Sequence, residues 1–290
     1  MPMKIERIGT TRYDLGESPF WDPIGGALYF ADSPAPAIHR LDPQTGAMDH
    51  WQLPGRYLGS FALREGGGAV LAMDAGFHLF DFESGECRTI CEPEVGLTDQ
   101  RFNDGKVDAR GRFIAGSMHR HFTMPTGSVY RLDADHSCAK LDDGYYCSNG
   151  PCWSPDGATF YIGDSGRGVI YAFDCDRETG AADNRRDFYS SSTCEPDGAT
   201  VDSQGYLWSA RFGAGNIHRI DPDGGLDRVI ELPIEWIASL TFGGPDLDVL
   251  YVTSIGYEMG GKRDPSPDAG GLFAIHDLGV TGRPEPRYKG

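Results

Sequence analysis

The stretch Asp22-Pro23-Ile24-Gly25-Gly26-Ala27-Leu28-Tyr29-Phe30 decides the fold, because it joins a glycine-containing turn to a short apolar strand and the pair recurs. Further copies of the strand begin at intervals of 42, 42, 47, 47 and 44 residues, at Val70, Arg112, Thr159, Tyr206 and Leu250. After each comes a second short strand with alternating polar and apolar residues, as in Ile217-His218-Arg219-Ile220-Asp221. Alternation of period two predicts strands, and the intervening turn residues predict hairpins.

Six repeats of this length, each with several short strands, predict an all-β fold: a six-bladed β-propeller of four-stranded antiparallel blades. No segment of ten or more residues has a convincing helical period, and the Gly-His and Trp-Asp signature of WD repeats is absent. We expect residues 1–290 to form one propeller domain. The N-terminal segment Lys4-Ile5-Glu6-Arg7-Ile8 should complete the last blade and close the ring.

Composition excludes several classes of protein. With 43 acidic and 26 basic residues the formal charge is −17, which disfavours binding to nucleic acid or to an anionic membrane surface. The seven cysteines are odd in number and lack paired metal spacing, so neither a disulfide framework nor a zinc site is expected. The N-terminus lacks an apolar signal core and no apolar run reaches 18 residues, which predicts a cytoplasmic protein. The sequence does not indicate an oligomeric state.

Four polar phrases hold similar places within the repeats. They are Gly16-Glu17-Ser18-Pro19, Arg101-Phe102-Asn103-Asp104-Gly105, Ser148-Asn149-Gly150 and Glu195-Pro196-Asp197-Gly198. Their central polar residues, Glu17, Asn103, Asn149 and Asp197, lie 9 to 11 residues before the recurring apolar strand of their repeat, which we call its anchor strand. In a propeller the first strand of each blade faces the axis, so the four polar side chains should meet there. The matching places in blades 2 and 6 hold only small residues, Gly59-Ser60 and Ser239, which leaves room for a ligand.

Pro196-Asp197-Gly198 has an alternative interpretation, because Pro-Asp-Gly is a common turn sequence. In its repeat, however, the turn before the anchor strand is already formed by Asp202-Ser203-Gln204-Gly205. The repeat register therefore places Asp197 one strand earlier, near the axis.

Two carboxylates and two amides that converge on the channel favour a bound cation, because buried unpaired carboxylates are strongly penalised. Glu17, Asn149 and Asp197 supply only oxygen ligands, which suits Ca²⁺, Mg²⁺ or Mn²⁺, with Fe²⁺ and Zn²⁺ left open. Three protein ligands leave positions for water and substrate, as in a catalytic site. A purely structural calcium site is the alternative.

These motifs resemble the regucalcin/gluconolactonase family of sugar lactonases over nearly the whole chain. The run Arg101-Phe102-Asn103-Asp104-Gly105-Lys106-Val107-Asp108 is its most specific part, and Ala115-Gly116-Ser117-Met118 also matches. The resemblance implies a six-bladed propeller with one divalent cation held by Glu17, Asn149 and Asp197. It further implies that Asp197 is the general base and that Arg101 and Asn103 bind the substrate.

One loop departs from the family pattern. After the Gly-Ser-Met stretch some relatives carry an acidic residue that contacts the sugar, whereas this chain reads His119-Arg120-His121-Phe122. That contact is either absent or replaced by His121. A second metal on His119 and His121 is a weaker alternative to a solvated loop. Trp236 either lines the pocket or packs in the core.

The function implied is metal-dependent hydrolysis of a sugar lactone (an aldonolactone) to its sugar acid, in carbohydrate catabolism. The cation would polarise the carbonyl, while Asp197 or a metal-bound hydroxide would act as the base. Two alternatives stay open: another propeller hydrolase of the arylesterase or phosphotriesterase kind, and a calcium-binding propeller without activity.

Overall fold

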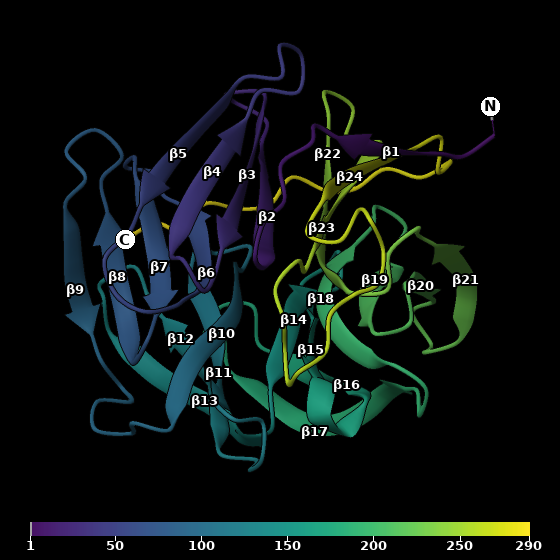
Figure 1. Ribbon diagram of the computed structural model, residues 1–290. Helices are drawn as coiled ribbons and strands as arrows, with labels where there is room; N and C mark the ends of the chain where they lie inside the picture. The colour runs from purple at the N-terminus through teal and green to yellow at the C-terminus, as the bar shows by residue number, and fades with distance from the viewer. Residues whose placement is uncertain (1) are drawn as a thin grey trace.

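The computed structural model describes residues 2–290 and contains six four-stranded antiparallel sheets, each a blade of a propeller (Figure 1). The innermost strand of each blade contacts that of the next, and the sixth contacts the first, so the blades form a closed ring. The six-bladed propeller predicted from the repeats is therefore confirmed. Within residues 2–290 the only helix is the short 3₁₀ turn η1, Ser165–Arg167.

Each blade runs from an inner to an outer strand. Blades 1 to 3 contain β2 (Gly16–Asp22), β3 (Ala27–Asp32), β4 (Ala37–Leu41) and β5 (Met48–Gln52); β6 (Leu58–Leu63), β7 (Ala69–Met73), β8 (Gly76–Phe80) and β9 (Cys87–Cys91); β10 (Gln100–Val107), β11 (Phe113–His119), β12 (Gly127–Leu132) and β13 (Cys138–Tyr145). Blades 4 and 5 contain β14 (Ser148–Trp153), β15 (Thr159–Asp164), β16 (Val169–Cys175) and β17 (Ala182–Ser190); β18 (Glu195–Val201), β19 (Leu207–Phe212), β20 (Asn216–Ile220) and β21 (Leu226–Glu231). Blade 6 contains β22 (Ile237–Gly243), β23 (Val249–Ser254), β24 (Leu272–His276) and β1 (Lys4–Ile8).

The N-terminal strand closes the ring, as predicted. β1 pairs with β24 in antiparallel register from Lys4 opposite His276 to Ile8 opposite Leu272. The outer strand of blade 6 therefore comes from the opposite end of the chain to its three neighbours (Figure 1).

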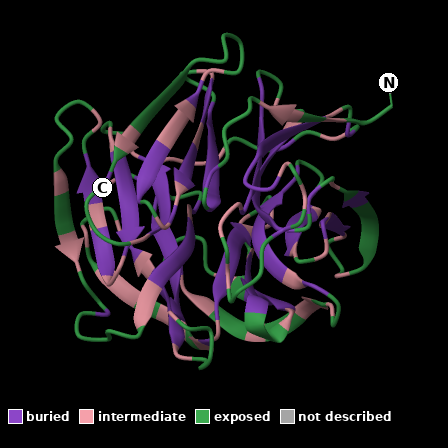
Figure 2. Cartoon of the chain, in the orientation of Figure 1, coloured by how far each residue is buried: buried purple, intermediate pink, exposed green. Residues whose placement is uncertain are grey.

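Burial follows the radial order of the strands, with inner strands buried and outer strands exposed (Figure 2). The apolar core is divided into clusters that lie between neighbouring blades. One such cluster joins Trp208 and Ile217 of blade 5 to Leu240 and Phe273 of blade 6. Because each cluster needs side chains from two blades, the blades stabilise one another rather than folding around separate cores.

All six innermost strands carry an irregularity at the same place. The register with the second strand shifts between Glu17 and Phe20 in β2, and between Asn149 and Cys152 in β14, with equivalent shifts in β6, β10, β18 and β22. A β-bulge re-aims side chains and bends the strand, and bulges are frequent beside functional sites. Four of these six bulges, those in β2, β10, β14 and β18, lie at or next to the polar phrases of the sequence.

The C-terminal segment, residues 277–290, forms a strap across the end of the ring where the inner strands finish (Figure 1). The buried Tyr288 binds two blades, because its N–H donates to Leu63 O at 2.9 Å and its hydroxyl to Asp133 O at 2.7 Å. Arg287 adds an ion pair to Asp22 of blade 1 at 2.6 Å. The strap thus ties blades 1, 2 and 3 together.

No helix formed by residues 2–290 has the length and apolar character needed to cross a membrane.

Candidate active site

The four polar phrases lie on the innermost strands of blades 1, 3, 4 and 5, as their spacing predicts. Glu17 is on β2, Asn103 on β10, Asn149 on β14 and Asp197 on β18, and all four side chains are buried. Pro196-Asp197-Gly198 belongs to a strand, whereas Asp202 begins the next turn by accepting from the N–H groups of Gln204 and Tyr206. The turn interpretation of Asp197 is therefore wrong, as the register indicated.

A chain of hydrogen bonds joins three of the predicted residues. Arg101 Nη1 donates to Asn103 Oδ1 at 2.7 Å, and Asn103 Nδ2 donates to Asn149 Oδ1 at 2.9 Å and to Ser148 O at 3.0 Å. Asn149 Nδ2 donates in turn to Ser165 Oγ at 2.9 Å. These contacts fix both amide groups, so that the Asn149 oxygen faces Asn103 and the axis.

The two predicted carboxylate ligands lie close enough to repel one another. Burial, and next the charges of Asp197 and Asp104, raise the pKa of Glu17 well above its usual value. Burial, and next the charges of Asp104 and Glu195, likewise raise the pKa of Asp197. Glu17 Oε2 is buried and accepts no hydrogen bond within the described residues. The charge of Arg101 and a backbone N–H at each carboxylate oppose these shifts, but the pKa values of both groups stay raised, so the chain compensates the pair only in part.

Asp104 is a third buried carboxylate, to which the sequence reasoning gave no role. Its Oδ1 accepts from Gly105 N at 2.8 Å and its Oδ2 from Gly150 N at 2.9 Å. Burial raises the pKa of Asp104, although the nearby Lys106 opposes the shift. In a regular strand the side chains of Asn103 and Asp104 would point to opposite faces. The bulge between Phe102 and Gly105 breaks this alternation, and the sequence gave no signal for the bulge.

Two glycines of the motifs are required by close approach. At Gly150 the φ angle is +57°, and an added Cβ would lie 2.8 Å from Asp197 O. At Gly198 an added Cβ would lie 2.0 Å from Ser239 Oγ of blade 6. The sequences Asn-Gly and Asp-Gly therefore let adjacent inner strands approach at the level of the site.

Arg101 is held from a second direction by an aromatic ring that the sequence reasoning missed. Its guanidinium carbon lies 3.7 Å from the centroid of the Tyr57 ring, a cation–π arrangement. Tyr57 precedes β6 and shares no offset with the polar phrases, so the repeat gave no signal for it. Trp236 packs in the same aromatic cluster, with its ring centroid 5.2 Å from that of Phe212. It is therefore part of the packing around the site.

His121 lies in the loop after β11, and its side chain is exposed. Its N–H donates to His119 Nδ1 at 3.3 Å, and the two imidazole centroids are 5.8 Å apart. His119 Nδ1 also contacts Thr123 Oγ1 at 3.2 Å, so this nitrogen is engaged within the loop. The hydrogen-bond chain joins Arg101, Asn103 and Asn149 but does not extend to His121, whose contact with substrate stays a prediction.

The residues present fit a hard divalent cation. Within residues 2–290 no three His, Cys, Asp or Glu side chains gather as a metal site, but the predicted set has two carboxylates and an amide. The donors are all oxygens, the carboxylates repel one another, and Glu17 Oε2 lacks a partner. A cation between Glu17 and Asp197 would offset each of these unfavourable features.

Comparison with known proteins gives an independent assignment. The model of the family described as "SMP-30/Gluconolactonase/LRE-like region" matches residues 15–256. A regucalcin from Xenopus laevis is 38% identical over 290 residues, covering 97% of this chain and 96% of that protein. A 6-deoxy-6-sulfogluconolactonase from Pseudomonas putida is 38% identical over 279 residues, covering 95% of each.

A solved structure has the same fold over almost its full length. The crystal structure of regucalcin from Agrobacterium tumefaciens, described as a calcium-binding protein, superposes with a TM-score of 0.91 at 28% identity. It covers 98% of this chain and 96% of its own. The family model, the close relatives and the shared propeller together show that this chain belongs to the SMP-30/gluconolactonase/LRE-like family.

Proposed function

We propose that the protein is a hydrolase of carboxylic esters that opens a sugar lactone to the corresponding sugar acid, with one divalent cation as cofactor, in carbohydrate catabolism. Membership of the family supports the reaction class, and so does the lactonase of Pseudomonas putida at 38% identity. The cation is supported by the calcium-binding description of the regucalcin structure.

The observation that carries the proposal is the pair of buried, mutually repelling carboxylates, Glu17 and Asp197, beside the ordered oxygen of Asn149. Such a pair is unfavourable as packing alone, and its retention indicates a ligand of opposite charge. Glu17, Asn149 and Asp197 would hold that ligand. When bound, a divalent cation supplies Lewis acidity toward a carbonyl oxygen and lowers the pKa of water.

The chain's own residues would then bind, orient and move protons. Arg101, fixed between Asn103 and the Tyr57 ring, offers its remaining N–H groups to substrate hydroxyls. Because the guanidinium is already immobilised, little side-chain entropy is lost when the sugar ring is oriented.

Asp197 is the proposed general base. Its carboxylate takes a proton from water as the water oxygen adds to the lactone carbonyl carbon. The tetrahedral species then collapses, the ring C–O bond breaks, and Asp197 returns the proton to the departing ring oxygen. General base catalysis of this kind contributes about 10²–10⁴ in rate.

The test is lactone hydrolysis followed with a pH indicator, using metal-free protein reloaded with Ca²⁺, Mg²⁺, Mn²⁺, Fe²⁺ or Zn²⁺ in turn. Asp197→Asn keeps an oxygen that can coordinate the metal but removes the carboxylate that acts as the base, so we expect kcat to fall about 10²–10⁴-fold. Asp223→Asn is the matched control, because Asp223 occupies the same Pro-Asp-Gly tripeptide in an exposed turn. An Asp197→Asn protein that binds metal and retains the wild-type kcat would refute the role.

The site requires several blades at once, since its residues come from blades 1, 3, 4 and 5. Ring closure by β1 and the C-terminal strap both act on this arrangement. We therefore propose that residues 1–290 act as a single propeller domain.

A further inference from the structure

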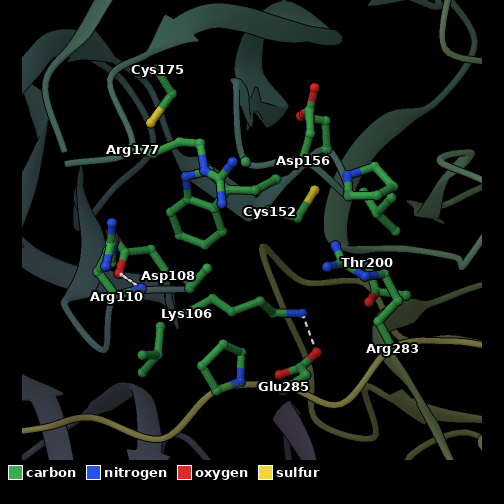
Figure 3. A pocket seen from close by; sticks show the side chains of 18 of the residues that line it. Lys106, Asp108, Arg110, Cys152, Asp156, Cys175, Arg177, Thr200, Arg283 and Glu285 are labelled. Carbon is green, nitrogen blue, oxygen red and sulfur yellow. Dashed lines mark hydrogen bonds and ion pairs between the residues drawn. The ribbon is translucent and has the colours of Figure 1, made fainter.

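A cavity lies at the opposite end of the inner strands from the candidate active site. Its volume is about 360 Å³, and it is lined where β10, β14 and β18 end, by Lys106, Trp153 and Thr200 among others (Figure 3). Residues 283–286 of the C-terminal strap form one of its walls. A cavity of this volume is at the lower end of the range for small-molecule sites.

This cavity is distinct from the site of lactone hydrolysis. None of Glu17, Asn149 and Asp197 lines the cavity. Along β14, Cys152 at the cavity comes three residues after Asn149 at the candidate site, a distance of at most about 10 Å at roughly 3.3 Å per residue. The Lys106–Glu285 ion pair, with Nζ and Oε1 2.6 Å apart, forms part of the cavity lining (Figure 3). A ligand in the cavity would therefore not touch Glu17 or Asp197.

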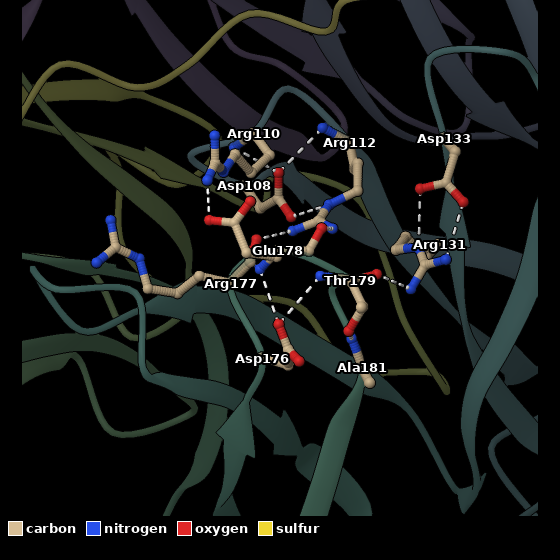
Figure 4. A network of polar contacts seen from close by, with 10 residues as sticks. All are labelled: Asp108, Arg110, Arg112, Arg131, Asp133, Asp176, Arg177, Glu178, Thr179 and Ala181. Carbon is tan, nitrogen blue, oxygen red and sulfur yellow. Dashed lines mark hydrogen bonds and ion pairs between the residues drawn. The ribbon is translucent and has the colours of Figure 1, made fainter.

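The cavity is basic although the chain as a whole is acidic. Five cationic side chains line it against three carboxylates. Three of the cations are matched by acidic partners: Lys106 by Glu285, Arg112 by Asp108, and Arg110 by Glu178 just outside the lining. Figure 4 shows the last two pairs as one network, in which Arg112 also donates to the carbonyl oxygens of residues 177 and 178.

Two guanidinium groups are left over, those of Arg177 and Arg283. Neither forms an ion pair or a hydrogen bond with any of residues 2–290, and Figure 4 shows the Arg177 side chain extending away from the network. The remaining carboxylate is that of Asp156, which accepts from Ser154 Oγ at 2.6 Å and from Ala158 N at 3.0 Å within its own turn. The cavity thus presents two guanidinium groups that form no ion pair or hydrogen bond with the described part of the chain. It also presents one carboxylate, which is held within its turn and whose pKa is lowered chiefly by Ser154 and slightly by the charge of Arg177.

Most of the remaining lining residues are apolar. The Trp153 side chain and the rings of Pro155, Pro284 and Pro286 supply surface suited to a carbon skeleton rather than to a bare ion. The hydroxyl group of Thr200 adds a polar contact. Arginine is the side chain best matched to phosphate oxygens, because its planar fork donates two parallel hydrogen bonds.

We propose that this cavity is a binding site for a small organic phosphate monoester, with Arg177 and Arg283 binding the phosphate and Trp153 contacting the carbon skeleton. This binding site is separate from the site of lactone hydrolysis, and the phosphate monoester would bind there without reacting. Because the strap forms one wall, the bound ligand would also contact the segment that ties blades 1, 2 and 3 together.

Calorimetric titration with glucose 6-phosphate tests the proposal, with glucose as the uncharged match and inorganic phosphate as the bare ion. EDTA removes metal from the candidate active site, and constant ionic strength removes differences in screening. We expect saturable one-to-one binding of glucose 6-phosphate, weaker binding of phosphate, and none of glucose. Ligand binding should also change tryptophan fluorescence, and Trp153→Phe should abolish that change while calorimetric binding persists.

The double variant Arg177→Gln/Arg283→Gln should weaken binding at least tenfold. The matched control is Arg88→Gln/Lys140→Gln, which removes the same charge from exposed positions on β9 and β13. Wild-type melting temperatures in both double variants would show that the fold is intact. The proposal is wrong if glucose 6-phosphate gives no saturable heat, if Arg177→Gln/Arg283→Gln binds within twofold of wild type, or if the control weakens binding equally.

Discussion

Replacing Glu17 by Gln should have opposite effects on the stability of the protein without metal and on its stability with metal bound. Burial, and next the charges of Asp197 and Asp104, raise the pKa of Glu17, and Glu17 Oε2 accepts no hydrogen bond among residues 2–290. Glu17→Gln keeps the shape of the side chain and removes one of the repelling charges. In EDTA we therefore expect the variant to equal or exceed the wild type in stability, by about 0.5–2 kcal/mol.

Metal should reverse this order. An ion that binds only the folded protein, at 100 times its Kd, stabilises it by about 2.7 kcal/mol. At roughly 2 °C per kcal/mol for a chain of this size, the wild-type Tm should rise by about 5 °C. Glu17→Gln replaces a charged ligand by a neutral amide, so most of this rise should be lost.

Differential scanning fluorimetry with EDTA and with each divalent ion measures both effects. Glu94→Gln is the matched control, since Glu94 is also buried with Oε2 lacking a partner among the described residues, but lies outside the site. The control should keep the full metal-dependent rise. The reasoning fails if no divalent ion raises the wild-type Tm, or if metal raises the Tm of Glu17→Gln by as much as it raises that of the wild type.

Two further predictions concern stability. Glu285→Leu should destabilise the protein by about 3–5 kcal/mol because it leaves the Lys106 ammonium buried without its carboxylate. Urea unfolding would contradict this if Lys106→Met/Glu285→Leu were no more stable than the single variant. Burial lowers the pKa of His39 and of His218 to about 4, from 6.5 in the unfolded chain. At these two histidines only the unfolded chain takes up protons in this range, so their contribution should make stability fall between pH 6.5 and pH 4. The double variant His39→Gln/His218→Gln should show a shallower fall in its urea midpoint, and an unchanged slope would count against the argument.

The repeat explains how much of the fold could be predicted. Strand pattern and spacing are local properties, and they located the second strand of every blade and the offset of Glu17, Asn103, Asn149 and Asp197. Three Pro-Asp-Gly tripeptides occur, ending at Gly157, Gly198 and Gly224, and only the register of the repeat distinguishes the one that reaches the site.

Contacts outside the repeat could not be predicted. The stacking of Arg101 on Tyr57 joins two blades at positions that the repeat does not align. Glu285 reaches Lys106 from a segment beyond the last repeat, so no periodic pattern connects them. The bulges were missed because a single extra residue per inner strand does not change the apolar pattern of the blade around it.

The pairing of β1 with β24 also sets the order of events during synthesis of the chain. At about 5–20 residues per second, a ribosome needs about 15–60 s to make a chain of this size. For most of that time β1 has no partner, because β24 lies far along the chain and is translated long after it. Blades 2 to 5 can fold one after another as they emerge. Blade 6, and the contact between blades 6 and 1 that we call the seam, can form only once β22 to β24 have been made. Glu17 lies on β2 beside that seam, so the ring around the site closes only after β24 has been translated.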